Sequence, residues 1–148
     1  MKHRCGFYIG DFFFSVPLES VREVLKKAVV APVPGTPPTV AGLLNLRGAI
    51  VTVLDIRSRL GLAPKPSAEP GALLLLDDGD ESVGLSIDRV GDVVGVEEGS
   101  FEPLPETLRG PARSLIQGAY KLPDRLMLAL DLDAVLDAER SMAEGSEK

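Results

Sequence analysis

The sequence predicts a mainly β protein with short helices, folded as two small barrels. Its apolar runs have the length of strands and are separated by glycine, proline and aspartate, which is typical of short strands joined by tight turns. Two stretches also share one order: a glycine, two apolar strands around a turn, an aspartate and a short helix. The interval from Gly42 to Asp55 equals that from Gly118 to Asp131. This internal similarity favours two barrels over one sandwich.

The clearest predicted element is a β-hairpin over residues 43–54. Apolar runs at residues 43–46 and 50–54 flank Arg47-Gly48, and a glycine can adopt the positive φ that a tight turn requires. We therefore expect Arg47 at the hairpin tip. A charge at the end of a rigid apolar ribbon suits contact with a partner better than a place in the core.

Further strands are indicated by short apolar runs between turn signals. They are expected at residues 5–9, 12–16, 28–33, 72–76, 82–87, 90–96, 115–122 and 126–130. Residues 61–71 contain three prolines and no periodic apolar pattern, so they are expected to form a surface linker. We place the approximate boundary between two subdomains there, within one domain spanning residues 1–148.

Three helical segments are predicted. Residues 17–25 carry Val21 and Leu25 at helical spacing. Asp55 is placed to cap a short helix over residues 56–60, and Asp131 to cap a closing helix over residues 132–139. The remaining tail, residues 140–148, is expected to be disordered.

Composition narrows the class of function. The chain has 148 residues, 45% of them hydrophobic and 5% aromatic, and a net charge of −6, which opposes binding to nucleic acid or to anionic membranes. The single cysteine, Cys5, excludes an internal disulfide and indicates a reducing compartment. No apolar run has the roughly 20 residues that a membrane-spanning helix needs. We expect a cytoplasmic protein without direct membrane insertion.

The sequence offers few groupings of residues that could catalyse a reaction or bind a metal ion. His3 is the only histidine, so neither a histidine general base nor a histidine metal cluster is expected. The acidic turn 77–81 lacks the ligand spacing of a calcium loop, and no phosphate-binding loop is present. Asp55, Asp88 and Asp131 each follow an apolar strand, where caps and turns explain them, although a carboxylate pair among them stays open. We expect no catalytic residue, metal or cofactor, and a binding module rather than an enzyme.

The stretch VAGLLNLRGAIVTVLDIRSRLGL, residues 40–62, resembles the signature of the CheW-like domain, the adaptor fold of bacterial chemotaxis systems. The likeness covers nearly the whole chain, with further motifs in the family's order. They are residues 7–10, 16–18, 21–24, 33–34, 37–38, 45–48, 83–90, 116–118 and 128–132.

This resemblance implies two SH3-like five-stranded barrels packed together, and a scaffold that couples chemoreceptors to a CheA-type histidine kinase within receptor arrays. It implies a receptor helix along an apolar groove between the subdomains and a kinase docked on a barrel end. By motif position, Val21, Glu23, Gly42 and Arg47 are the expected partner-binding residues. Core packing could also explain Val21, a backbone requirement Gly42, and a structural salt bridge Arg47.

The sequence departs from the family pattern at Thr52, where proline is usual in the second hairpin strand. That departure leaves room for a paralogous adaptor serving a type IV pilus or a non-motility receptor system. Two other classes stay open: the regulatory domain of a larger kinase, and a small-ligand or metal-binding sensor that uses the aspartates at strand ends.

Overall fold

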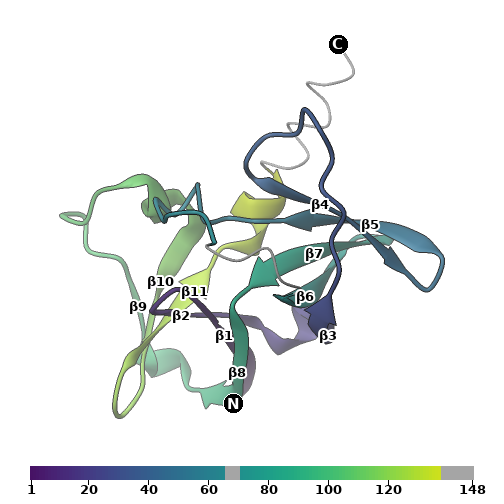
Figure 1. The fold of residues 1–148 in the computed structure, drawn as a ribbon. Helices are drawn as coiled ribbons and strands as arrows, with labels where there is room; N and C mark the ends of the chain where they lie inside the picture. The colour runs from purple at the N-terminus through teal and green to yellow at the C-terminus, as the bar shows by residue number, and fades with distance from the viewer. Residues whose placement is uncertain (66–70, 138–148) are drawn as a thin grey trace.

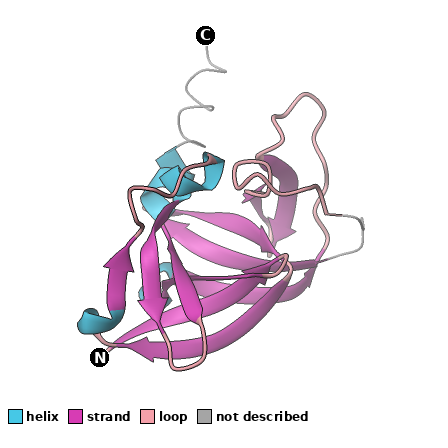
Figure 2. Cartoon of the chain, turned by 90° about the vertical axis from the view of Figure 1, so that its left-hand side faces the viewer, coloured by secondary structure: helices cyan, strands magenta, loops and turns pink. Residues whose placement is uncertain are grey.

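The computed structural model describes residues 1–65 and 71–137, and most of these form β-strands (Figure 1). The strands are β1 (Lys2–Ile9), β2 (Phe12–Pro17), β3 (Val21–Ala28), β4 (Val40–Leu46), β5 (Ala49–Leu54), β6 (Gly71–Asp78), β7 (Glu81–Ile87), β8 (Arg89–Val96), β9 (Phe101–Pro103), β10 (Ile116–Lys121) and β11 (Leu126–Leu130). Short 3-10 helices occur at η1 (Leu18–Ser20), η2 (Glu98–Ser100) and η3 (Pro111–Leu115), and residues 132–137 are α-helical. These helical segments lie at the margins of the strands (Figure 2).

The strands form two sheets. The first sheet has the order β8-β1-β2-β11-β10-β9, and the second has the order β3-β6-β7-β5-β4. This confirms the predicted mainly β fold of two SH3-like subdomains, the first of which gains a sixth strand because three-residue β9 pairs with β10. The chain passes between the sheets twice, through η1 and through Asp88.

The two sheets have equivalent strand orders. The β4–β5 hairpin joins the second sheet through a parallel pairing of β5 with β7, and the β10–β11 hairpin joins the first through a parallel pairing of β11 with β2. The order β8-β1-β2-β11-β10 therefore corresponds to β3-β6-β7-β5-β4. The internal similarity between Gly42–Asp55 and Gly118–Asp131 is thus a structural equivalence.

The main hydrophobic core lies between the subdomains. It joins buried residues of both sheets, among them Phe7, Phe14, Leu74 and Leu85. Each subdomain adds a smaller cluster of its own. Strand β6 is buried on both faces: Leu74 and Leu76 belong to the shared core, whereas Leu73 and Leu75 face the interior of the second subdomain. This explains its uninterrupted apolar sequence, since a strand covered on both faces cannot alternate with polar residues.

The helix predicted over residues 17–25 is wrong beyond Ser20. Only η1 is helical, and β3 begins at Val21 and pairs with β6. The helical spacing of Val21 and Leu25 does not reflect a shared face: β3 has a register shift after Val21, and Val21 packs against the core between the subdomains whereas Leu25 packs inside the second subdomain. This segment is a strand because it pairs with the buried strand β6.

Two shorter predictions also need correction. Residues 28–33 do not form a strand: β3 ends at Ala28, and Ala31 makes only an isolated bridge to Leu43. Residues 56–60 form a turn rather than a helix, although the Leu60 N–H donates to the Ile56 carbonyl at 2.9 Å. Asp55 does cap this turn, because its Oδ1 accepts from the Arg57 N–H at 2.9 Å.

The expected boundary at residues 61–71 falls between β5 and β6, which belong to the same sheet. The sheets are therefore not divided there, and residues 66–70 lie outside the described residues. The closing helix is present over residues 132–137, and Asp131 Oδ1 accepts from the Ala134 N–H at 3.1 Å. The end of that helix and the tail at 140–148 also lie outside the described residues.

Candidate functional site

The β4–β5 hairpin ends in a two-residue turn formed by Arg47 and Gly48. Leu46 pairs with Ala49, and both turn residues have positive φ, 49° for Arg47 and 87° for Gly48. Such a turn matches the twist of the flanking strands. Asn45 stabilises it, because its Oδ1 accepts from the Gly48 N–H at 3.2 Å. Arg47 thus lies at the hairpin tip, as predicted.

Arg47 forms a salt bridge with Glu23 of β3. Their closest atoms, Arg47 Nη2 and Glu23 Oε2, are 2.7 Å apart, and Arg47 Nη1 lies 3.4 Å from Oε1. Strands β3 and β4 are the two edges of the second sheet, so the pair bridges those edges and closes the subdomain. The side chains are 68% and 34% exposed, respectively. Much of the guanidinium surface therefore still faces solvent.

Each partner of this pair favours the charged form of the other. The hydrogen bond from Arg47 is the main reason why the pKa of Glu23 lies below its ordinary value. The hydrogen bond to Glu23 likewise raises the pKa of Arg47. Because the pair is exposed, its contribution to folding stability is small. Its effect is to hold two opposite charges in a fixed geometry at the edge of the subdomain.

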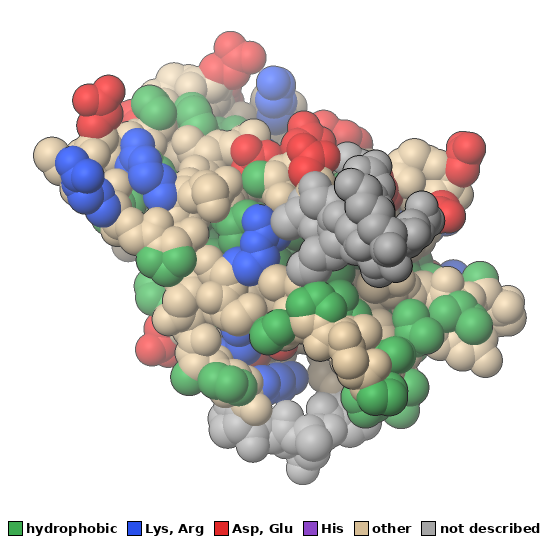
Figure 3. Space-filling view, turned by 90° about the horizontal axis from the view of Figure 1, so that it is seen from above, with side chains coloured by type: hydrophobic (Ala, Val, Ile, Leu, Met, Phe, Trp, Pro, Cys, Tyr) green, Lys and Arg blue, Asp and Glu red, His purple; other side chains and the backbone are tan. Residues whose placement is uncertain are grey.

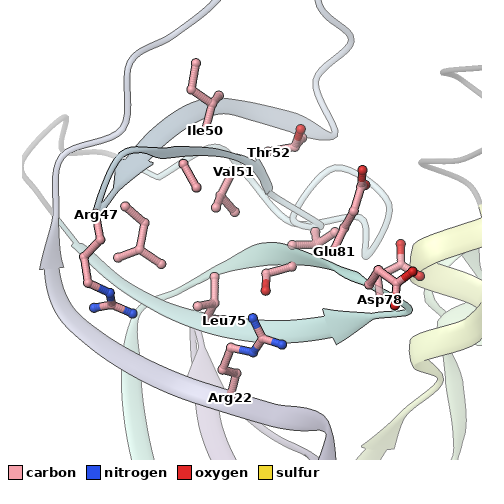
Figure 4. A pocket seen from close by; sticks show the side chains of 13 residues that line it. Arg22, Arg47, Ile50, Val51, Thr52, Leu75, Asp78 and Glu81 are labelled. Atoms are coloured by element: carbon pink, nitrogen blue, oxygen red, sulfur yellow. The ribbon is translucent and has the colours of Figure 1, made fainter.

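Beside the salt bridge, an open groove of about 580 Å³ lies between the β4–β5 hairpin and the ends of β6 and β7 (Figure 4). Arg47 stands at one end of the groove, and Asp78 and Glu81 stand at the other. Ile50 projects beside it and is 74% exposed. The lining includes Arg22, Arg47, Ile50, Thr52, Asp78 and Glu81. The groove thus combines an apolar side chain with both signs of charge.

Arg22 is a groove residue that the sequence analysis missed. Its Nε lies 2.8 Å from Asp77 Oδ1, which ties β3 to the end of β6. Reading residues 21–25 as a helix hid this placement. Read as a strand, the same segment pairs with β6, with a register shift between Val21 and Glu23 that interrupts the regular alternation of side chains at Arg22.

The other two expected partner-binding residues lie apart from the hairpin tip. Val21 is half-buried on β3 and packs against the core between the subdomains. Gly42 is buried in β4 with φ of 151°, and a Cβ there would overlap the Ala31 carbonyl. Only glycine fits this close approach of two backbone segments. The structure brings Glu23 and Arg47 together, while Val21 and Gly42 occupy separate positions.

Each strand-end aspartate has a hydrogen-bonding or ionic partner of its own. Asp55 caps the turn that follows it, Asp131 caps the closing helix, and Asp88 forms a salt bridge with Arg57. Within residues 1–65 and 71–137, no group of three or more His, Cys, Asp or Glu side chains is placed to hold a metal ion. Cys5 is buried, and that burial raises the pKa of its thiol.

No helix in the described part of the chain is long and apolar enough to span a membrane. On the face seen in Figure 3, acidic and basic side chains are interspersed with apolar ones. The groove at the hairpin end likewise places the exposed side chain of Ile50 beside charges of both signs.

Comparison with known proteins identifies the fold family. The model of the CheW-like domain matches residues 5–140. The chain is 29% identical to chemotaxis protein CheW of Rhizobium meliloti over 93% of this chain and 89% of that protein. It is 30% identical to chemotaxis protein CheW of Helicobacter pylori over 88% of this chain and 79% of that protein.

Another relative is protein PilI of Pseudomonas aeruginosa, which is 27% identical over 78% of this chain and 65% of PilI. Among solved structures, scaffolding protein TtCheW of Thermoanaerobacter tengcongensis superposes with a TM-score of 0.77 at 25% identity, over 88% of each chain. The strand order, the hairpin and these matches agree: the chain belongs to the CheW-like domain family.

Proposed function

We propose that this protein is a non-catalytic cytoplasmic adaptor that couples chemoreceptors to a CheA-type histidine kinase. The observation that carries the proposal is the extent of the family match, residues 5–140, together with relatives named chemotaxis protein CheW and a similar structure titled a scaffolding protein. An adaptor needs two partner surfaces on one rigid body. The packing of two subdomains around one shared core supports the proposal, because it would hold two such surfaces in a fixed relation.

The kinase surface is assigned to the hairpin end of the second sheet. Ile50 supplies an exposed apolar anchor, and the salt-bridged Arg47 and Glu23 supply ordered charges at the edge of the groove. Interfaces of this kind concentrate binding energy in a few central residues surrounded by polar contacts. Charges of both signs at the groove also discriminate between partners, because a like charge placed opposite each of them is unfavourable.

The receptor surface is assigned to the junction of the two subdomains. Val21 lies there, half-buried against the shared core. A receptor helix would place its apolar face against such a junction in the manner of a helix in a groove. The two surfaces are distinct, so both partners can bind at once. The adaptor would then act by linkage, shifting the kinase between active and inactive arrangements without reacting itself.

A pilus-associated pathway is the second candidate. The observation that favours it is the similarity to protein PilI. The fold and the partner surfaces would be the same, and the identity of the receptor would differ. Recovery of a pilus-associated receptor, rather than a chemoreceptor, would decide in its favour.

The test is capture of partners from the native host by purified wild type and by Arg47→Ala. We expect a histidine kinase and a receptor with the wild type, and less kinase with Arg47→Ala although its circular dichroism is unchanged. Absence of both partners at low salt would contradict the adaptor function. Loss of the folded state in Arg47→Ala would contradict the binding role of Arg47.

A charge exchange separates a direct contact from a structural one. The double variant Glu23→Arg, Arg47→Glu preserves an ion pair between the sheet edges but reverses the charges that a partner meets. If Arg47 contacts the kinase, this double variant remains defective in kinase binding. Restored binding would show that the salt bridge itself is what matters.

A further inference from the structure

Asp88 occupies a special position in the chain. It is the single residue between β7, which belongs to the second sheet, and β8, which belongs to the first. Its backbone angles set the direction in which β8 leaves β7 and so contribute to the orientation of one sheet against the other. Hinges of this kind are formed by a few residues at the ends of elements.

The Asp88 carboxylate is held from both sides of this crossing. Arg57, in the turn after β5 of the second sheet, approaches with Nη2 2.7 Å from Oδ1 and 2.6 Å from Oδ2. Gly10, in the turn between β1 and β2 of the first sheet, donates its N–H to Oδ2 at 2.6 Å. The Asp88 N–H in turn donates to the Tyr8 carbonyl at 2.8 Å. These contacts make Asp88 a clamp between the sheets.

The clamp is shielded from solvent and supported on the arginine side. The side chains of Arg57 and Asp88 are only 14% and 28% exposed, so salt screens the pair less than it screens a surface pair. A second guanidinium nitrogen of Arg57 donates to the Ala63 carbonyl at 3.2 Å. By contrast, η1 at the other crossing has no side-chain cap hydrogen bond.

We infer that Arg57 and Asp88 are positioning residues: their clamp fixes the orientation of the two sheets at the β7–β8 crossing. The consequence for signalling rests on the proposed function, because the clamp then also fixes the kinase surface relative to the receptor surface. Arg59, in the same turn as Arg57, also links the second sheet to a segment that follows the first sheet. Arg59 donates to the Ala134 and Val135 carbonyls of the closing helix at 3.4 and 3.5 Å.

The clamp is tested without any partner by measuring the distance between the sheets. Spin labels at Lys27→Cys on β3 and Gln117→Cys on β10, both exposed strand positions, report that distance in a Cys5→Ala background. Wild type is compared with Arg57→Gln. The matched control is Lys121→Gln, which removes the same charge and breaks the 2.8 Å pair with Glu102 inside the first sheet.

We expect one narrow distance distribution for wild type and for Lys121→Gln, and a broadened or shifted one for Arg57→Gln. Asp88→Asn should behave like Arg57→Gln, because a neutral amide retains an acceptor for Gly10 but loses the ion pair. A narrow, unshifted distribution in a folded Arg57→Gln would overturn the inference. So would equal broadening in the control.

A second measurement tests whether receptor binding changes the affinity of the protein for the kinase. Binding of kinase alone and of receptor alone to Arg57→Gln should stay close to wild type, whereas the change in kinase affinity caused by receptor, of the order of 5- to 150-fold in allosteric systems, should fall. If wild type binds neither partner, the proposed function fails while the distance measurement still decides the clamp. If coupling persists unchanged in a variant with broadened distances, the assigned role in signalling is wrong.

Discussion

Gly42 and Gly118 occupy equivalent places in the two sheets. Each lies at a register shift of its hairpin, between Val40 and Gly42 in one and between Ile116 and Gly118 in the other. In both, an added Cβ would overlap a backbone carbonyl of a neighbouring segment, that of Ala31 or that of Glu102. Both hairpins therefore require a glycine at the same place, because a neighbouring backbone carbonyl leaves no room for a side chain. This requirement explains why the glycine is repeated in the sequence.

Alanine at either glycine should therefore destabilise the fold. We expect Gly42→Ala and Gly118→Ala each to lower the free energy of unfolding by about 2 kcal/mol or more, because the carbonyl must move. Gly99→Ala is the control, since nothing lies within 4 Å of its added Cβ, and it should change stability by less than about 0.5 kcal/mol. Urea unfolding measures all three. If all three variants lose equally little stability, the backbone around Gly42 and Gly118 can shift to make room for a Cβ, and the prediction is wrong.

Exposed Ile50 should matter for binding and not for folding. Ile50→Asp is expected to weaken kinase affinity about tenfold or more by titration calorimetry, because it places a charge on the apolar anchor. The matched control is Val29→Asp, since Val29 is 73% exposed and Ile50 is 74% exposed. Both variants should unfold at the wild-type urea midpoint. The assignment of the groove is wrong if the two variants bind the kinase equally well.

Ser15 should contribute to stability through one buried and one partly buried hydrogen bond. Its Oγ accepts from Arg4 Nε at 2.8 Å and donates to the Leu128 carbonyl at 3.1 Å. Ser15→Ala leaves the buried guanidinium without one of its acceptors, so we expect a loss of about 2 kcal/mol. Ser100→Ala removes an exposed bond of 2.6 Å to the Glu97 carbonyl and should have little effect. Similar unfolding midpoints for both variants would contradict this role.

Stability should depend on pH through Asp88. Burial acts to raise the pKa of Asp88, but hydrogen bonds from Arg57 and Gly10, with the charges of Arg57 and Lys65, outweigh it and hold that pKa below its ordinary value. A carboxyl with a depressed folded-state pKa stabilises fully above its unfolded pKa, about 3.9, and this contribution is lost as pH falls through the folded value.

The stability difference between wild type and Asp88→Asn should therefore be largest above about pH 5 and should shrink as the pH drops below about 4. Chemical denaturation across that range measures it. Glu102→Gln is the comparison, because Glu102 also has a lowered pKa through its hydrogen bond with Lys121 but lies on the exposed surface. A difference that stays constant with pH would exclude the Asp88 ion pair as its source.

Local chemistry made much of the fold predictable. The Arg47-Gly48 turn, the hairpins and the aspartate caps follow from residues that are neighbours in sequence. The partners of distant residues do not: Glu23 and Arg47 are 24 positions apart, and Gly10 and Asp88 are 78 apart. Strand β9 was missed for the same reason. Its short, proline-ended sequence becomes a strand only through pairing with β10.

The strand order has a consequence for how the chain folds during synthesis. All strands of the second sheet lie between residues 21 and 87, so that sheet can assemble as soon as this segment has been made. The first sheet joins the start of the chain to its end, and Ser15 bonds Leu128 across 113 positions. In the β1–β2 hairpin, Phe7 and Phe14 can pack against the second sheet through the shared core, but Phe13 clusters with Met127 of β11 and must therefore wait with uncovered aromatic surface until that strand leaves the ribosome. Because long-range pairing is slow and exposed apolar surface promotes aggregation, this hairpin is where a nascent chain would depend most on chaperones.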